Sequence, residues 1–239
     1  MYTTPHITIV TLALLAFTAA NAANADPLRV TDLLPGQIRI TELMADPAKV
    51  SDTRGEWFEI YNPLGSPIDL QGLVVRSKGS GSSTESFNVH SSALLDAGGL
   101  FLLGRTPATG ENGGMNLDWT WGNSISLGNT NDFISLSRPD GTLLAKVAWA
   151  SSQAGTSWEV QGGIATDQVQ ADLVAAAATF KYGRGDLGTP GAFNSDMLAL
   201  GGSGVAAVPE PSTYALLGAG LGLLGLREAR RRRTLHPVG

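Results

Sequence analysis

The sequence contains no cysteine among its 239 residues. Disulfides, thiolate zinc sites, iron–sulfur clusters and cysteine nucleophiles are therefore excluded. Because no covalent cross-link is available, the folded part of the chain must be stabilised by its hydrophobic core. The roughly 170 residues that lie between two apolar ends are enough to bury such a core in one domain.

Histidine and positive charge are also scarce. His90 is the only histidine outside the two ends, so a Ser-His-Asp site would have to use it, and no G-x-S-x-G sequence is present. We therefore interpret His90 as an exposed residue at a strand end.

Residues 26–208 contain 19 acidic and 11 basic residues, a net charge of −8. Since phosphate contacts need a basic face, this acidity argues against nucleic-acid binding.

The N-terminal segment has no Lys or Arg, yet it otherwise has the pattern of a signal peptide. Residues 7–17 form an apolar run, and two A-x-A sequences follow it, ending at Ala22 and Ala25. An apolar run before a small-residue cleavage site is typical of a secretory signal. We therefore predict that signal peptidase removes residues 1–25, cutting after Ala22 or Ala25, and that residues 26–36 form an N-terminal linker.

The C-terminus combines a short motif, an apolar run and a basic cluster. The motif is Pro209, Glu210 and Pro211, and residues 214–226 are apolar and Gly-rich. The cluster consists of Arg227, Arg230, Arg231, Arg232 and Arg233. An apolar helix followed by arginines is a stop-transfer element with its basic end in the cytoplasm. At a rise of 1.5 Å per residue the run reaches about 20 Å, less than the roughly 30 Å hydrocarbon core, which suits a temporary anchor.

This three-part tail resembles the PEP-CTERM sorting signal. The resemblance implies that an exosortase, a membrane-embedded protease, recognises Pro209, Glu210 and Pro211 and removes the tail. It also implies a transient inner-membrane anchor with the domain on the periplasmic side, followed by the cell surface or extracellular matrix. Such proteins accompany exopolysaccharide and biofilm. The tail would span residues 209–233, with a Gly/Ser/Ala linker at 196–208 before it and a cytoplasmic end at 234–239.

Between these ends the chain has the pattern of short strands separated by turns. Strands are predicted at residues 38–43, 57–61, 100–103, 133–136 and 143–149. The sequence Arg-Pro-Asp-Gly-Thr at 138–142 is a strong hairpin signal, and residues 169–179 are the one helix-like segment. This spacing favours an all-β sandwich. Alternation along residues 57–61 predicts that Phe58 and Ile60 face the interior and Trp57 the other side.

Several blocks resemble a bacterial lamin-tail domain. The opening blocks are IRITELMADP at residues 38–47 and GEWFEIYNP at 55–63, followed by PIDLQGL at 67–73. Shorter matches follow in the same order, at residues 133–136, 139–141 and 188–194. The resemblance covers residues 37–195 and implies an immunoglobulin-like β-sandwich, from a family whose members often accompany enzymes.

Two groups of side chains are candidates for chemistry. The acidic group contains Glu42, Asp46, Glu56 and Glu59. Several carboxylates suit calcium, but the sequence has no D-x-D-x-D-G loop, so these residues also fit hydrogen bonds to backbone amides and arginines. Trp119 and Trp121 lie two residues apart and would share a face in a strand, as a sugar-stacking platform requires.

We therefore predict a non-catalytic surface or matrix protein with no cofactor. Its expected partners are signal peptidase, an exosortase, and exopolysaccharide or other surface proteins, and it would contact the membrane through the C-terminal helix. Two alternatives remain open. One is a carbohydrate-binding module that uses Trp119 and Trp121. The other is a metal-dependent hydrolase, with calcium as the candidate ion, built on the acidic group.

Overall fold

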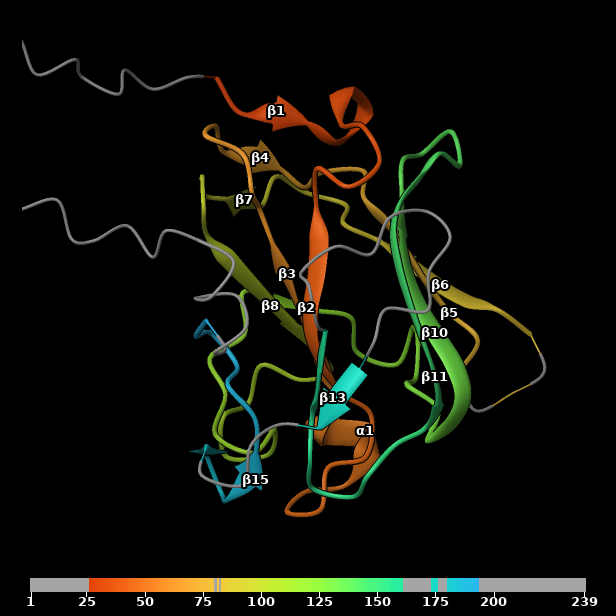
Figure 1. Cartoon of the computed structure of the whole chain (residues 1–239), viewed down its shortest axis with the longest axis vertical. Coiled ribbons are helices and arrows are strands. Elements are labelled where there is room, and N and C mark those ends of the chain that lie inside the picture. The colour runs from red at the N-terminus through yellow and green to blue at the C-terminus, as the bar shows by residue number, and fades with distance from the viewer. Residues whose placement is uncertain (1–25, 80, 82, 161–172, 176–179, 194–239) are drawn as a thin grey trace, which may run out of the picture.

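The computed structural model describes residues 26–79, 81, 83–160, 173–175 and 180–193 (Figure 1). The predicted signal peptide, the linker at 196–208 and the whole sorting tail lie outside these residues. Of the helices within the described ranges, none is long and apolar enough to cross a membrane.

The fold is the predicted β-sandwich, built from two main sheets that face each other (Figure 1). The larger sheet has the order β13 (Leu173–Ala175), β12 (Trp158–Val160), β2 (Arg39–Met44), β3 (Trp57–Tyr61), β8 (Leu100–Gly104) and β9 (Trp119–Thr120). The smaller sheet has the order β11 (Leu143–Ser151), β10 (Thr130–Ser137), β5 (Val74–Ser77) and β6 (Glu85–Asn88). Within these two sheets, neighbouring strands are antiparallel except β8 and β9.

Smaller elements close the two ends of the sandwich. A three-stranded sheet combines β1 (Leu28–Arg29), β4 (Ile68–Asp69) and β7 (Leu94–Leu95), and a two-stranded one combines β14 (Lys181–Tyr182) and β15 (Asp186–Leu187). The helices of the described part are one-turn pieces, η1 (Val30–Asp32) and α1 (Asp52–Gly55). An all-β fold with almost no helix is thus confirmed.

The main core lies between the two sheets. Phe58 and Ile60 of β3 are fully buried there, together with Ile134 of β10 and Val147 of β11. Side chains alternate across a strand, so the inward position of Phe58 places Trp57 on the opposite side. The prediction for the faces of this strand is confirmed.

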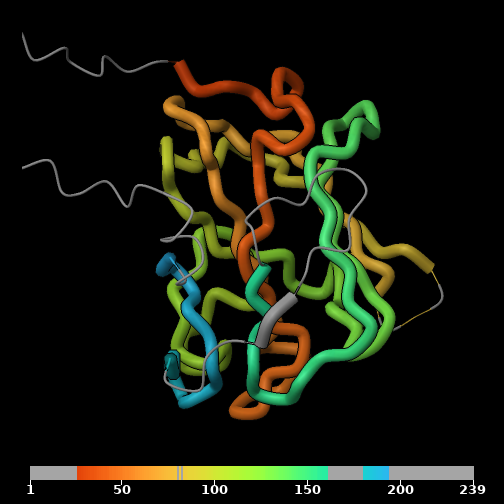
Figure 2. Tube along the Cα trace, in the orientation of Figure 1, coloured from red at the N-terminus to blue at the C-terminus, as the bar shows by residue number. Residues whose placement is uncertain are grey.

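Trp57, on the opposite face of β3, is also fully buried, with an exposed fraction of 0%. It packs with Met44, Leu102 and Met115 in a second apolar cluster outside the main core, against Tyr182. Its indole Nε1 donates a hydrogen bond to the Tyr182 hydroxyl at 2.9 Å. Figure 2 shows the late segment, in blue, running beside the loop of Gly113, whose carbonyl accepts a hydrogen bond from the backbone of Arg184. Both faces of β3 are therefore covered.

Two sequence-based expectations for segments are wrong. The predicted helix-like segment at 169–179 contains strand β13, which pairs antiparallel with β12, and the rest of it lies outside the described residues. An open strand edge supplies backbone partners that override the helix preference of an alanine-rich run. The predicted N-terminal linker at 26–36 contains β1 and buries Val30 and Leu33, so that part belongs to the domain.

The predicted hairpin between β10 and β11 is confirmed. The backbone N–H of Arg138 donates to the carbonyl of Thr142 at 2.9 Å, and the Asp140 carboxylate accepts from the Thr142 N–H at 2.8 Å. Gly141 has a φ of +88°, which favours glycine at this turn position.

Candidate functional site

The four predicted carboxylates do not form one site. Glu42 and Glu59 lie opposite each other on β2 and β3, whereas Glu56 is paired with Arg105 and Asp46 contacts the hydroxyl of Ser152. No three His, Asp or Glu side chains of the described ranges converge as metal ligands. The calcium site and the hydrolase built on one acidic cluster therefore lose their geometric basis.

Glu42 and Glu59 form a buried pair that holds the end of the domain, and we call it the carboxylate clamp. Each side chain is 1% exposed. Glu42 accepts hydrogen bonds from the Thr189 backbone N–H at 2.9 Å and hydroxyl at 2.7 Å, and from the Ser157 hydroxyl. Glu59 accepts from the Gly191 N–H at 2.7 Å, and from the hydroxyl of a neighbouring threonine on β2. The clamp thus binds the last described segment to the middle of the larger sheet.

Burial sets the protonation of the clamp. Burial, with a smaller contribution from the charge of the nearby Glu42, raises the pKa of Glu59 to about 8 against the lowering effect of its hydrogen bonds. Burial also raises the pKa of Glu42. Two facing carboxyl groups in a dry site disfavour double ionisation. The pair therefore retains a proton near neutral pH.

Glu56 and Arg105 lie at a pocket of about 500 Å³. The Arg105 guanidinium donates to Glu56 Oε2 at 2.9 Å, and the Leu127 N–H donates to the same oxygen at 3.0 Å. Asp52 and Glu85 also line the pocket. Burial raises the pKa of Glu56 to about 7, although the bonds from Arg105 and Leu127 oppose the shift.

At this pocket a carboxyl group with a pKa of about 7, that of Glu56, could exchange protons at neutral pH. Its closest charged partner is an arginine, which stabilises a carboxylate and supplies no nucleophile. Sequence reasoning named Glu56 but missed Arg105 and Glu85, since no spacing links residues that converge only through the fold.

The two tryptophans do not form a platform. Trp121 is 4% exposed and stacks on Phe58 at 5.4 Å and on Phe87 at 5.9 Å between ring centroids. Trp119 is half-buried, with its ring 5.1 Å from that of His90, which is exposed as interpreted. The shared-face prediction fails because β9 ends at Thr120, so alternation does not extend to Trp121.

Comparison with known families identifies two regions of the chain. Residues 34–151 match the Lamin Tail Domain model, and residues 207–233 match the PEP-CTERM protein-sorting motif. No curated protein matches the chain. The fold and these matches define an exported β-sandwich domain joined to a sorting signal. The chain is a lamin tail domain protein that carries a PEP-CTERM sorting motif.

The matched motif contains Pro209, Glu210 and Pro211, which lie outside the described residues, as do the five arginines of the basic cluster. The motif implies export, membrane-anchored sorting at the C-terminus and processing by an exosortase. The motif thus indicates that the chain is sorted by an exosortase. Lamin tail domains are generally non-catalytic.

Proposed function

We propose that the domain is a non-catalytic structural or adhesive module of the cell surface or extracellular matrix, associated with exopolysaccharide and biofilm. In this proposal the domain first lies on the periplasmic side of the inner membrane and is then released outward.

The observation that carries this proposal is that the buried carboxylates accept hydrogen bonds from groups within the domain. Glu42 and Glu59 accept hydrogen bonds that fasten the segment at 189–191, and Glu56 accepts bonds from Arg105 and Leu127. Buried polar groups that are satisfied in this way stabilise and specify a fold. These carboxylates therefore have structural roles that need no substrate.

One experiment follows the protein through the producing cell. Wild type should accumulate in the matrix or surface fraction without its tail. Pro209→Ala with Glu210→Ala should leave a larger, membrane-bound precursor, because the recognition motif is lost while the apolar run stays intact. Ser212→Ala with Thr213→Ala is the matched control and should be processed normally. Wild-type protein that stays in the membrane fraction at full length would overturn the proposal.

A second experiment tests the absence of catalysis. The purified chain is assayed against glycosidase, esterase, phosphatase and nuclease substrates, with and without added calcium. We expect no turnover above that of Glu56→Gln, which removes the pocket-lining carboxyl group whose pKa is raised to about 7. Turnover by wild type that is absent in Glu56→Gln would place an active site beside Arg105, and turnover lost only in Glu59→Gln would place it at the clamp.

A further inference from the structure

The outer face of the four-stranded sheet carries a row of aligned side chains, which we call the cationic face. Ser135 on β10 pairs with Lys146 on β11 and with Arg76 on β5, and Arg76 pairs with Ser86 on β6. Directly paired residues of antiparallel strands point to the same side of a sheet. Since Ile134 and its alternating neighbours point into the core, this row points away from it.

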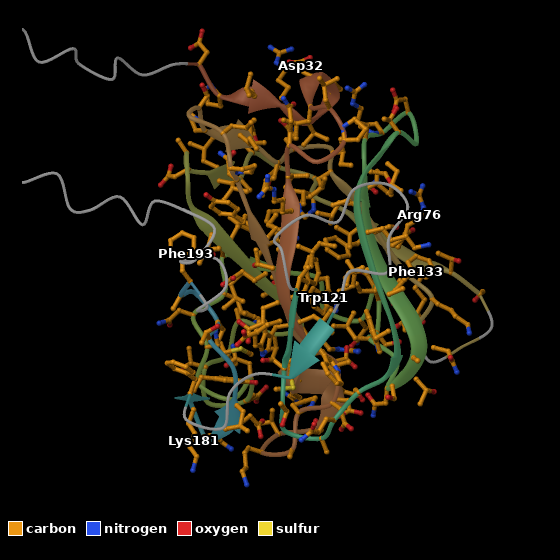
Figure 3. All side chains as sticks on the ribbon, in the orientation of Figure 1. Asp32, Arg76, Trp121, Phe133, Lys181 and Phe193 are labelled. Carbon is orange, nitrogen blue, oxygen red and sulfur yellow. The ribbon has the colours of Figure 1, made fainter. Side chains whose placement is uncertain are left out.

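Phe133 lies on the same face, two residues before Ser135. The Lys146 Nζ is 4.5 Å from the centroid of its ring, a cation–π distance. Phe133, Lys146 and Arg76 are each half-buried and therefore partly open to solvent. Figure 3 shows Arg76 and Phe133 on the outer side of the sheet, while Trp121 lies in the interior.

The charge of this face is opposite to that of the domain. The two acidic residues of these four strands, Asp132 and Glu85, are held elsewhere: Asp132 is 2% exposed and accepts the Gly128 N–H, and Glu85 accepts the Ser126 N–H at 2.7 Å. Within the described ranges neither Arg76 nor Lys146 takes part in an ion pair. Lys78, directly after β5, is exposed and adds a third cation at one end.

We propose that the cationic face binds a carboxylate-bearing polysaccharide, an inference that rests on the proposed matrix function and names its ligand. Arg76 and Lys146 are two strand spacings apart, roughly 10 Å, so they can meet successive carboxylates of one chain. Phe133, two residues before Ser135 on the strand between them, adds an aromatic side chain that the apolar face of a sugar ring can contact. Double-stranded DNA carries a charge about every 1.7 Å and would be repelled more strongly by a domain of net charge −8.

The test uses the full chain in detergent micelles and measures binding to immobilised alginate and hyaluronate, with neutral dextran as a blank. Arg76→Gln with Lys146→Gln should weaken alginate binding about tenfold, since each charge contact contributes a modest amount. Lys49→Gln with Lys181→Gln removes the same charge from exposed sites away from this sheet and should change binding less than twofold. Phe133→Leu keeps an apolar side chain, loses the ring and should weaken binding about threefold.

Several outcomes would overturn the inference. One is an equal loss of binding in the Arg76/Lys146 and Lys49/Lys181 double variants. Another is no binding of either acidic polysaccharide by the unmodified chain. A third is equally tight binding of DNA or anionic phosphatidylglycerol vesicles through Arg76 and Lys146. If one of these results is found while the protein still reaches the matrix and shows no turnover, only the inference about the ligand has failed. If the protein remains in the membrane or is an enzyme, the proposed function has failed, whether or not the chain binds alginate.

Discussion

The two sheets have similar inner faces and different outer faces. Inside, both contribute apolar side chains to one core. Outside, the larger sheet is covered by its own chain: Trp57 meets Tyr182, Tyr61 meets Phe193, and the clamp holds the segment at 189–191. On the outer face of the smaller sheet, Arg76 and Lys146 are half-buried, and among the described residues they have no ion-pair partner. The outer face of the larger sheet thus contributes to stability. The outer face of the smaller sheet carries the two cations to which we assign ligand binding.

The largest expected effect is on the inner face. Phe58→Ala should lower the free energy of unfolding by about 3–5 kcal/mol, because it opens a cavity beside Trp121 in a domain with no disulfide. Chemical denaturation of the chain without its tail measures this loss. Phe58→Leu should cost much less, and a cost for Phe58→Ala below that of Trp57→Ala would reverse the ranking of the two faces.

A slightly smaller loss is expected on the covered face. Trp57→Ala should cost about 2–4 kcal/mol, since the ring is fully buried but part of its contact is with one late segment that can shift. Limited proteolysis near Tyr182 should accelerate in this variant, whereas in Phe58→Ala the increase should follow global unfolding. Unchanged proteolysis in Trp57→Ala would show that the late segment is held by other contacts.

The clamp predicts a dependence on pH. The pKa of Glu59 is raised from 4.5 to about 8 in the fold, so the folded state binds the proton more tightly than the unfolded chain. Stability from this group is fully present below about pH 4.5 and is lost as pH rises through about 8, by an amount on the order of a few kcal/mol. Glu42 and Glu56, whose pKa values are also raised, act in the same direction.

Thermal unfolding from pH 5 to pH 8.5 measures this slope. The midpoint should fall with rising pH in wild type and fall less in Glu59→Gln, which imitates the protonated acid. A midpoint that rises over this range would contradict the burial-driven shift, and an unchanged slope in Glu59→Gln would assign it to the other two carboxyl groups.

The smallest effect is expected on the cationic face. Arg76→Gln with Lys146→Gln should change the unfolding free energy by less than about 1 kcal/mol, because half-exposed charges outside ion pairs contribute little to stability. The same denaturation measurement applies. A large loss would mean that this face stabilises the domain as the covered face does, and would remove the contrast between the two sheets.

How much the sequence could reveal depended on the range of the contacts. Alternation along one strand was enough to place Phe58 and Trp57 on opposite faces. It could not foresee that Trp57 is covered by Tyr182, 125 residues later. The platform of Trp119 and Trp121 failed because alternation holds only inside a strand. The pocket at Glu56 could not be predicted, since Arg105 reaches it only after β3 and β8 have paired.

The carboxylate clamp also determines where mechanical load enters the domain. While the chain is tethered through its C-terminus, tension within the described residues passes from Phe193, which contacts Tyr61, to Gly191 and Thr189. These residues are fastened to β2 and β3, which lie in the middle of the six-stranded sheet. A pull on the tether is therefore shared between two central strands, each paired on both sides, and does not peel an edge strand away. Under the proposed function, in which the domain attaches to a matrix, this arrangement would let the anchored molecule resist such a pull.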